Sequence, residues 1–231
     1  MRRAFPLVFS IFALSANSLA LDPIARLEAV EAVRWSPAYT CTQVIGFSQT
    51  RQWYLDGGAF EELVDDAGWQ FLDHSGTATV ELANPRFDGW DAIHSPCAAN
   101  SDSPDRIILS ISDKDYIGTP RIWVDEIIEP VVETLKDRYP YAEVILLQPV
   151  IGGPDHALCQ GSREPIKASF NHPYIDRAIE HVARLDAMVE VGMSPELTRC
   201  SGYVDNTGHL TESAMVSMGQ IIGEYYAERE E

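Results

Sequence analysis

Short apolar runs alternate with longer segments of helical period along most of the chain. Helices are predicted where apolar residues recur three and four positions apart, over residues 59–66, 123–138, 174–185 and 212–228. Strands are predicted where the run is short and mostly β-branched or leucine-rich, over residues 43–47, 69–72, 106–112, 143–150 and 187–191. The alternation predicts a single α/β domain in which helices cover a mostly parallel five-stranded sheet.

Three polar residues lie in the segments that follow predicted strands. Ser48 comes directly after the first strand, and Asp205 and His209 lie between the last strand and the last helix. Right-handed crossovers bring the carboxyl ends of all parallel strands to one edge of the sheet, where ligands usually bind. We therefore expect these three distant residues to meet at that edge.

Serine, histidine and aspartate together suggest nucleophilic catalysis. A serine hydroxyl is a poor nucleophile unless a neighbouring base takes its proton, and a carboxylate orients and stabilises a histidine that does so. The sequence therefore predicts a catalytic triad in which Ser48 is the nucleophile, His209 the base and Asp205 the orienting acid.

The first residues have the pattern of an export signal. Arg2 and Arg3 precede a short apolar stretch, and Ser18-Leu19-Ala20 has small residues where a cleavage site needs them. The stretch is shorter than the roughly 20 residues that span a bilayer. We expect residues 1–20 to be a signal peptide and residues 21–231 to be the mature domain, secreted or periplasmic.

The chain is strongly acidic, with a formal net charge of −18 at pH 7 over 231 residues. Its acidic residues are spread along the sequence and form no tail. Binding to nucleic acid or to an anionic membrane needs a basic face, so neither is expected as a partner. We expect a monomer that acts on a neutral or cationic small molecule or carbohydrate.

Four cysteines, Cys41, Cys97, Cys159 and Cys200, predict two disulfides in an exported chain. Cys41 and Cys97 precede predicted strands, whereas Cys159 and Cys200 follow predicted strands. The expected pairs are therefore Cys41 with Cys97 and Cys159 with Cys200.

The serine after the first strand and the late aspartate–histidine segment resemble the SGNH, or GDSL-type, hydrolases over most of the predicted mature chain. Gly46-Phe47-Ser48 stands where that family has Gly-Asp-Ser, and three residues separate Asp205 from His209 where the family usually has two. The resemblance implies a flavodoxin-like three-layer α/β/α sandwich and the hydrolysis of carboxylic esters without a cofactor.

The same resemblance implies an oxyanion hole made by the backbone N–H of Ser48, a glycine after the second strand and an asparagine after the third. Gly76 follows the second strand closely and is the preferred glycine, with Gly89 as the alternative. No asparagine follows the third strand, so the hydroxyl of Ser112 is assigned as the third donor, and Lys114 stays open.

Other residues are candidates for binding the substrate. Trp53 and Tyr54 follow Ser48 closely and offer stacking faces, although aromatic residues at such spacings are more often core. Asn171 is a candidate to supply the missing amide donor, or else it belongs to a loop at a helix start. The remaining polar residues lack the tight spacing of a metal site, so no metal is expected; they are Asp155, His156, His172 and Asp176.

These observations predict an exported serine esterase, with acetyl esters of carbohydrates as the favoured substrates. One alternative is a binding module that keeps the fold and has lost turnover, which the missing asparagine and Phe47 favour. The other is a carboxylate-based glycosidase that uses Asp56, Asp113 or Asp115.

Overall fold

The computed structural model describes residues 39–64, 66–92, 97, 103–112, 119–152, 173–205 and 208–229. All of them belong to one compact unit, Ser36–Glu231. The predicted signal peptide lies outside the described residues.

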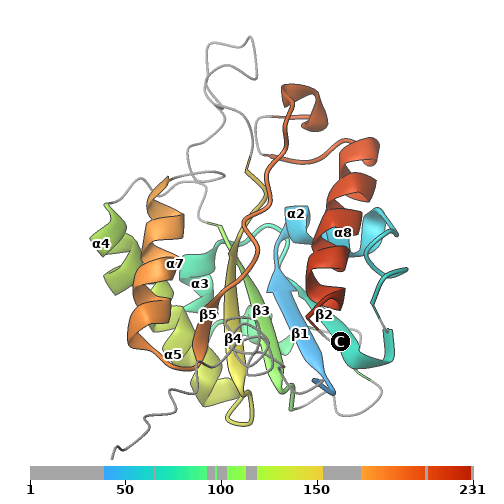
Figure 1. The fold of residues 1–231 in the computed structure, drawn as a ribbon. Coiled ribbons are helices and arrows are strands. Elements are labelled where there is room, and N and C mark those ends of the chain that lie inside the picture. Colours follow the sequence, from blue (N-terminus) through green and yellow to red (C-terminus); the bar gives the residue numbers. More distant parts are fainter. Residues whose placement is uncertain are drawn as a thin grey trace, which may run out of the picture. The chain divides into compact units, whose positions relative to one another are not determined.

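A five-stranded, all-parallel sheet forms the centre of this unit (Figure 1). Its strands are β1 (Thr42–Gly46), β2 (Trp69–Asp73), β3 (Arg106–Ile111), β4 (Val144–Pro149) and β5 (Val189–Val191). They lie in the order β2-β1-β3-β4-β5, which is the flavodoxin-like order. The predicted α/β fold and the positions of all five strands are thereby confirmed, with boundaries that differ by one or two residues.

The strands at the centre of a parallel sheet are usually buried on both faces, and the three central strands follow this pattern. Every residue of β1, β3 and β4 is buried, although these strands carry glutamines, a threonine, an arginine and a serine among their apolar residues. The polar side chains find partners inside the sheet: the amide of Gln70 donates to Gln43 at 2.8 Å, and Nε of Arg106 donates to Thr42 at 2.8 Å. Neighbouring strands therefore share buried hydrogen bonds as well as apolar contacts.

Helices pack on both sides of the sheet (Figure 1). On one side α8 (Glu212–Ala227) contacts η2 (Gln52–Asp56), a π-helical segment that continues α2 (Ser48–Arg51). The other group contains α3 (Thr79–Leu82), α4 (Pro120–Ile122), η5 (Trp123–Ile128), α5 (Glu129–Arg138) and α7 (Pro173–Leu185). Shorter 3-10 turns are η3 (Asp66–Gly68), η4 (Asp88–Asp91) and η7 (Cys200–Gly202).

The prediction of a helix over residues 59–66 is wrong. Residues 59–63 form turns, and the helical segment lies earlier, from Ser48 to Asp56. Gly57 ends that helix, and Gly58 has a φ of 73°, which favours glycine and takes the chain out of the helix. The apolar residues after it, including Phe60, pack on the aromatic residues of η2 without continuing the helix.

The long helix predicted over residues 123–138 is divided into segments. Its middle part, Trp123–Ile128, has π-helical hydrogen bonding, and α-helical bonding resumes at Glu129. Pro130 follows this junction and has no N–H to donate, so the regular ladder is interrupted here.

The Cys41–Cys97 disulfide is confirmed, and it links residues 56 positions apart. Cys200 is also disulfide-bonded, and its expected partner, Cys159, lies outside the described residues. Among the described residues, no helix has the length and apolar character needed to cross a bilayer.

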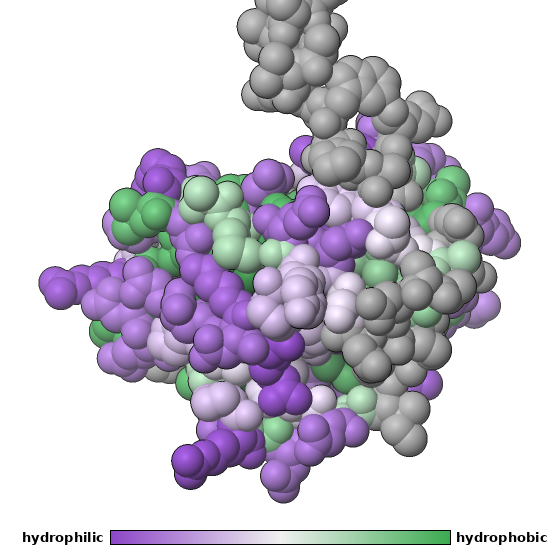
Figure 2. All heavy atoms as spheres, turned by 90° about the horizontal axis from the view of Figure 1, so that it is seen from below, coloured by the Kyte–Doolittle hydropathy of each residue, from purple (hydrophilic) through white to green (hydrophobic). Residues whose placement is uncertain are grey.

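Figure 2 views the molecule from below, toward the end at which the strands begin. Hydrophilic side chains cover most of the face seen there, and hydrophobic ones are scattered among them. The strands end at the opposite edge of the sheet, where β1 leads into α2 (Figure 1).

Candidate active site

Ser48 sits on a sharp turn from β1 into α2. β1 ends at Gly46, Phe47 is the N-cap, and Ser48 is the first residue of the helix. A Cβ at Gly46 would lie 2.3 Å from Oγ1 of Thr50, so only glycine lets the helix fold back this closely on the strand. Thr50 in turn donates a buried hydrogen bond of 2.9 Å to Ser110 of β3. The helix that carries Ser48 is therefore held directly against the sheet.

Asp205 and His209 lie at the two ends of a short hairpin loop. Tyr203 and Leu210 form an antiparallel bridge, and the N–H of Val204 donates to the carbonyl of His209 at 2.9 Å. Gly208, immediately before His209, has a φ of 87°. This left-handed conformation, which favours glycine, brings the chain back to His209 within the loop.

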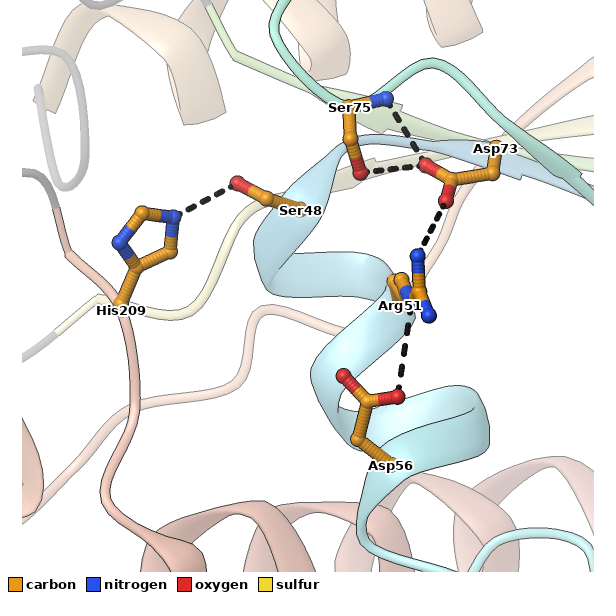
Figure 3. A network of polar contacts seen from close by, with 6 residues as sticks. All are labelled: Ser48, Arg51, Asp56, Asp73, Ser75 and His209. Atoms are coloured by element: carbon orange, nitrogen blue, oxygen red, sulfur yellow. Dashed lines mark hydrogen bonds and ion pairs between the residues drawn. The ribbon is translucent and has the colours of Figure 1, made fainter.

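The structure brings Ser48, Asp205 and His209 into a line of hydrogen bonds. Nε2 of His209 lies 3.0 Å from Oγ of Ser48, the contact drawn in Figure 3. On the other side of the ring, Nδ1 lies 2.7 Å from Oδ2 of Asp205, whose Oδ1 also accepts the backbone N–H of His209 at 3.1 Å. The carboxylate therefore reaches the ring although three residues separate Asp205 from His209 in the sequence.

The site is accessible to a substrate. The side chains of His209 and Asp205 are 35% and 38% exposed, and Ser48 is half-buried. A neutral imidazole that donates from Nδ1 to Asp205 has its Nε2 lone pair directed at the serine hydroxyl. This arrangement can remove a proton from Ser48 and return it to a leaving group.

The two expected oxyanion residues lie just after the strands that flank β1, which are β2 and β3. Gly76 follows β2 with a φ of 90°, in a loop tied to the end of β1 because the N–H of His74 donates to the carbonyl of Gly46 at 2.7 Å. Ser112 follows β3 on the other side, but its N–H already donates to Oγ1 of Thr79 at 2.7 Å. Of its two donors, only the hydroxyl of Ser112 is left to reach a substrate.

Gly89, the alternative glycine, belongs to the short turn η4. A Cβ there would lie 2.2 Å from the ring of Phe87, so this glycine is needed for local packing. This observation favours Gly76.

The expectation that Trp53 and Tyr54 line a substrate pocket is wrong. They are 1% and 5% exposed. Both rings pack on Phe60, with centroid distances of 5.0 and 4.8 Å, and Tyr54 also stacks on Phe71 of β2. Both rings face the sheet and Phe60, and α8 packs against η2, so these aromatic side chains are core.

A polar network beside Ser48 was not predicted from the sequence (Figure 3). Arg51 lies 3.5 Å from Asp73 and 3.4 Å from Asp56. The other oxygen of Asp73 accepts both the N–H and the hydroxyl of Ser75. An aspartate two residues before a serine, at the end of a strand, is typical of such a turn and is the sequence signal that was available.

Asp56, one of the carboxylates considered for a glycosidase, is exposed and paired with Arg51. The other two, Asp113 and Asp115, lie outside the described residues. The same holds for Lys114, Asn171, Asp155, His156 and His172.

His74, directly after β2, is a buried histidine. It is 3% exposed and lies against the rings of Phe87 and Trp90, at centroid distances of 5.9 and 5.5 Å. Its buried Nε2 has no hydrogen-bond partner among the described residues. Burial lowers the pKa of His74 to about 4 although neighbouring Asp73 acts in the opposite direction, so this histidine is neutral at pH 7.

No model of a known protein family matches the chain, and no curated protein matches it either. We therefore infer function from the residues of the site and their geometry.

Proposed function

We propose that the protein is an exported serine esterase that hydrolyses carboxylic esters through an acyl-enzyme. The observation that carries the proposal is the 3.0 Å contact between Nε2 of His209 and Oγ of Ser48, with Asp205 on the opposite ring nitrogen. A serine, a base and an orienting acid in hydrogen-bond contact are the components that nucleophilic acyl transfer requires.

In the proposed first half-reaction, Oγ of Ser48 attacks the ester carbonyl carbon while its proton passes to Nε2 of His209. Asp205 stabilises the imidazolium that forms. The tetrahedral intermediate then expels the alcohol, which takes the proton from Nε2, and an ester of Ser48 remains. The alkoxy group of the substrate leaves with this proton as the alcohol.

In the second half-reaction, a water molecule gives a proton to Nε2 of His209 and its oxygen attacks the acyl carbon. Collapse of the new intermediate returns the proton to Oγ of Ser48 and releases the carboxylic acid. The enzyme ends in its starting state, and no cofactor takes part.

The oxyanion of both intermediates needs hydrogen-bond donors. Ser48 is the first residue of α2, so its backbone N–H has no acceptor within the helix. We assign this N–H and that of Gly76 as donors, with the hydroxyl of Ser112 as the third. One such donor is typically worth about 10²–10³ in turnover.

We propose acetyl esters of carbohydrates as the substrate class, acted on by a monomer in the periplasm or outside the cell. The Cys41–Cys97 disulfide fits an oxidising compartment. The net charge of −18 disfavours anionic substrates.

Labelling with a fluorophosphonate probe followed by mass spectrometry tests the proposal without assuming a substrate. We expect a covalent adduct at Ser48 that is abolished in Ser48→Ala and reduced in His209→Ala. Ser217→Ala, which changes a serine of α8, is the matched control and should label like the wild type. Absence of an adduct at Ser48, or equal ester hydrolysis by the wild type and Ser48→Ala, would reject the esterase and favour the binding module.

A further inference from the structure

Two glutamines on the helix of the nucleophile hold the backbone on either side of His209. Nε2 of Gln49 donates to the carbonyl of Gly208 at 2.8 Å, and Oε1 of Gln52 accepts the N–H of Leu210 at 2.9 Å. Gln49 is the residue after Ser48, and Gln52 lies one helical turn further. The residues before and after the histidine are therefore both bound by the segment that carries the serine.

Gln49 has little freedom to release its partner. Its side chain is 3% exposed, and its Oε1 accepts the N–H of Ile151 at 2.6 Å. Rotation of the amide by half a turn would place Nε2 against that N–H and Oε1 against the carbonyl of Gly208. Both hydrogen bonds would be lost in a buried site, so the orientation seen is strongly preferred.

A further contact links the hairpin to the same point of the sheet. The hydroxyl of Tyr203 donates to the carbonyl of Ile151 at 3.1 Å, just after β4 ends. Burial raises the pKa of this phenol, so Tyr203 remains a donor at neutral pH. Gln49 and the loop of His209 thus share one anchor, the backbone of Ile151.

We propose that Gln49 and Gln52 are positioning residues that set the distance between Nε2 of His209 and Oγ of Ser48. The inference rests on the proposed esterase function and extends it beyond the triad. The serine and both glutamines lie on one short helical segment, so the segment that carries the nucleophile binds the backbone on both sides of the base directly. A misplacement of about 1 Å at such a contact is enough to cost about 10²-fold in rate.

Gln52 is the better residue to test because it is only half-buried. Gln52→Met keeps the size of the side chain and removes the acceptor for the N–H of Leu210. Gln52→Glu keeps an acceptor oxygen at that position. Gln49→Met removes the hydrogen bonds of the Gln49 side chain to Gly208 and Ile151. Gln220→Met, on the exposed face of α8, is the control.

The measurements are the rate of fluorophosphonate labelling at Ser48 and, with p-nitrophenyl acetate, kcat and KM separately. We expect Gln52→Met and Gln49→Met to lower kcat and labelling by about 10- to 100-fold with little change in KM, since the base is displaced and the substrate surface is not. Gln52→Glu should recover most of the loss, and Gln220→Met should behave like the wild type. Far-UV circular dichroism and the melting temperature identify any variant that does not fold, and the two Gln52 variants suffice if Gln49→Met fails.

The outcome separates this inference from the proposed function. If the wild type labels at Ser48 and folded Gln52→Met labels equally fast, the positioning role is overturned and the esterase stands. If the wild type does not label, the proposed esterase function is rejected. Crystal structures of the wild type and Gln52→Met then test the positioning role. An unchanged distance from Nε2 to Oγ then overturns it, and a contact lengthened beyond hydrogen-bond reach supports it.

Discussion

The carboxylate of Asp205 holds His209 at two points, the backbone N–H and the imidazole Nδ1. The two contacts measure 3.1 and 2.7 Å and use different oxygens of the same side chain. Together they fix the orientation of the ring and the tautomer in which Nε2 is unprotonated and faces Ser48.

The first prediction follows from this double contact. Asp205→Asn places an amide N–H against Nδ1, so the ring adopts the tautomer with its proton on Nε2 and no longer accepts a proton from Ser48. We expect kcat for p-nitrophenyl acetate to fall by about 10³–10⁴ with little change in the melting temperature. Asp56→Asn, which weakens only the exposed ion pair with Arg51 and leaves both contacts to His209 in place, is the control. Equal kcat in Asp205→Asn and the wild type would remove Asp205 from the triad.

The second prediction concerns the aromatic core beneath the site. Trp53→Ala should lower the free energy of unfolding by about 3–5 kcal/mol because it removes a large, buried side chain. Leu185→Ala, at a side chain that is 71% exposed, should change it by less than about 0.5 kcal/mol. Urea unfolding measures both. A small loss of stability in Trp53→Ala together with a raised KM would instead indicate that Trp53 contacts the substrate.

The third prediction is a dependence of stability on pH caused by His74. Its pKa is about 4 in the folded protein and 6.5 in the reference state. Between these values the unfolded chain binds a proton that the folded protein excludes, so the free energy of unfolding decreases as the pH falls through this range. The full effect of this one group is about 3 kcal/mol.

His74→Phe tests this dependence because phenylalanine suits the neighbouring rings of Phe87 and Trp90 and cannot be protonated. Urea unfolding at several pH values between the two pKa values should show a shallower decrease in His74→Phe than in the wild type. His181→Gln, at an exposed histidine of α7, should keep the wild-type slope. Parallel pH profiles for the wild type and His74→Phe would contradict the assignment.

The fourth prediction concerns the disulfide at the start of β1. Replacing Cys41 and Cys97 together by serine should lower the free energy of unfolding by about 4 kcal/mol, because the bond closes a loop of 56 residues in the unfolded chain. Labelling at Ser48 should persist in the folded fraction, since the bond lies at the edge of the sheet opposite the triad. Denaturant unfolding and the fluorophosphonate assay check the two statements. Loss of labelling without loss of stability would disagree with both.

The sequence predicted the sheet well because its strands are buried on both faces, and such strands appear as short, nearly continuous apolar runs. It did not predict the helix from Ser48 to Asp56. That segment is short and contains polar residues whose partners come from distant parts of the chain, such as Gln49 with Ile151 and Gly208. The spacing of the apolar residues after Gly58 predicts a helix although they form turns, because spacing alone does not distinguish the two.

The sequence by itself determined the fold class, the Cys41–Cys97 pair and the three residues proposed as the triad. The spacing of apolar residues, the direction of the strands and the chemistry of each residue can all be inferred from short stretches of sequence. Only the tertiary structure decided which side chains face the nucleophile. Trp53 and Tyr54 are near Ser48 in sequence and point into the core, whereas Gln49 and Gln52 reach the loop of His209. The direction of a side chain on a short helix depends on what packs against each of its faces, and those neighbours come from elements far away in the chain.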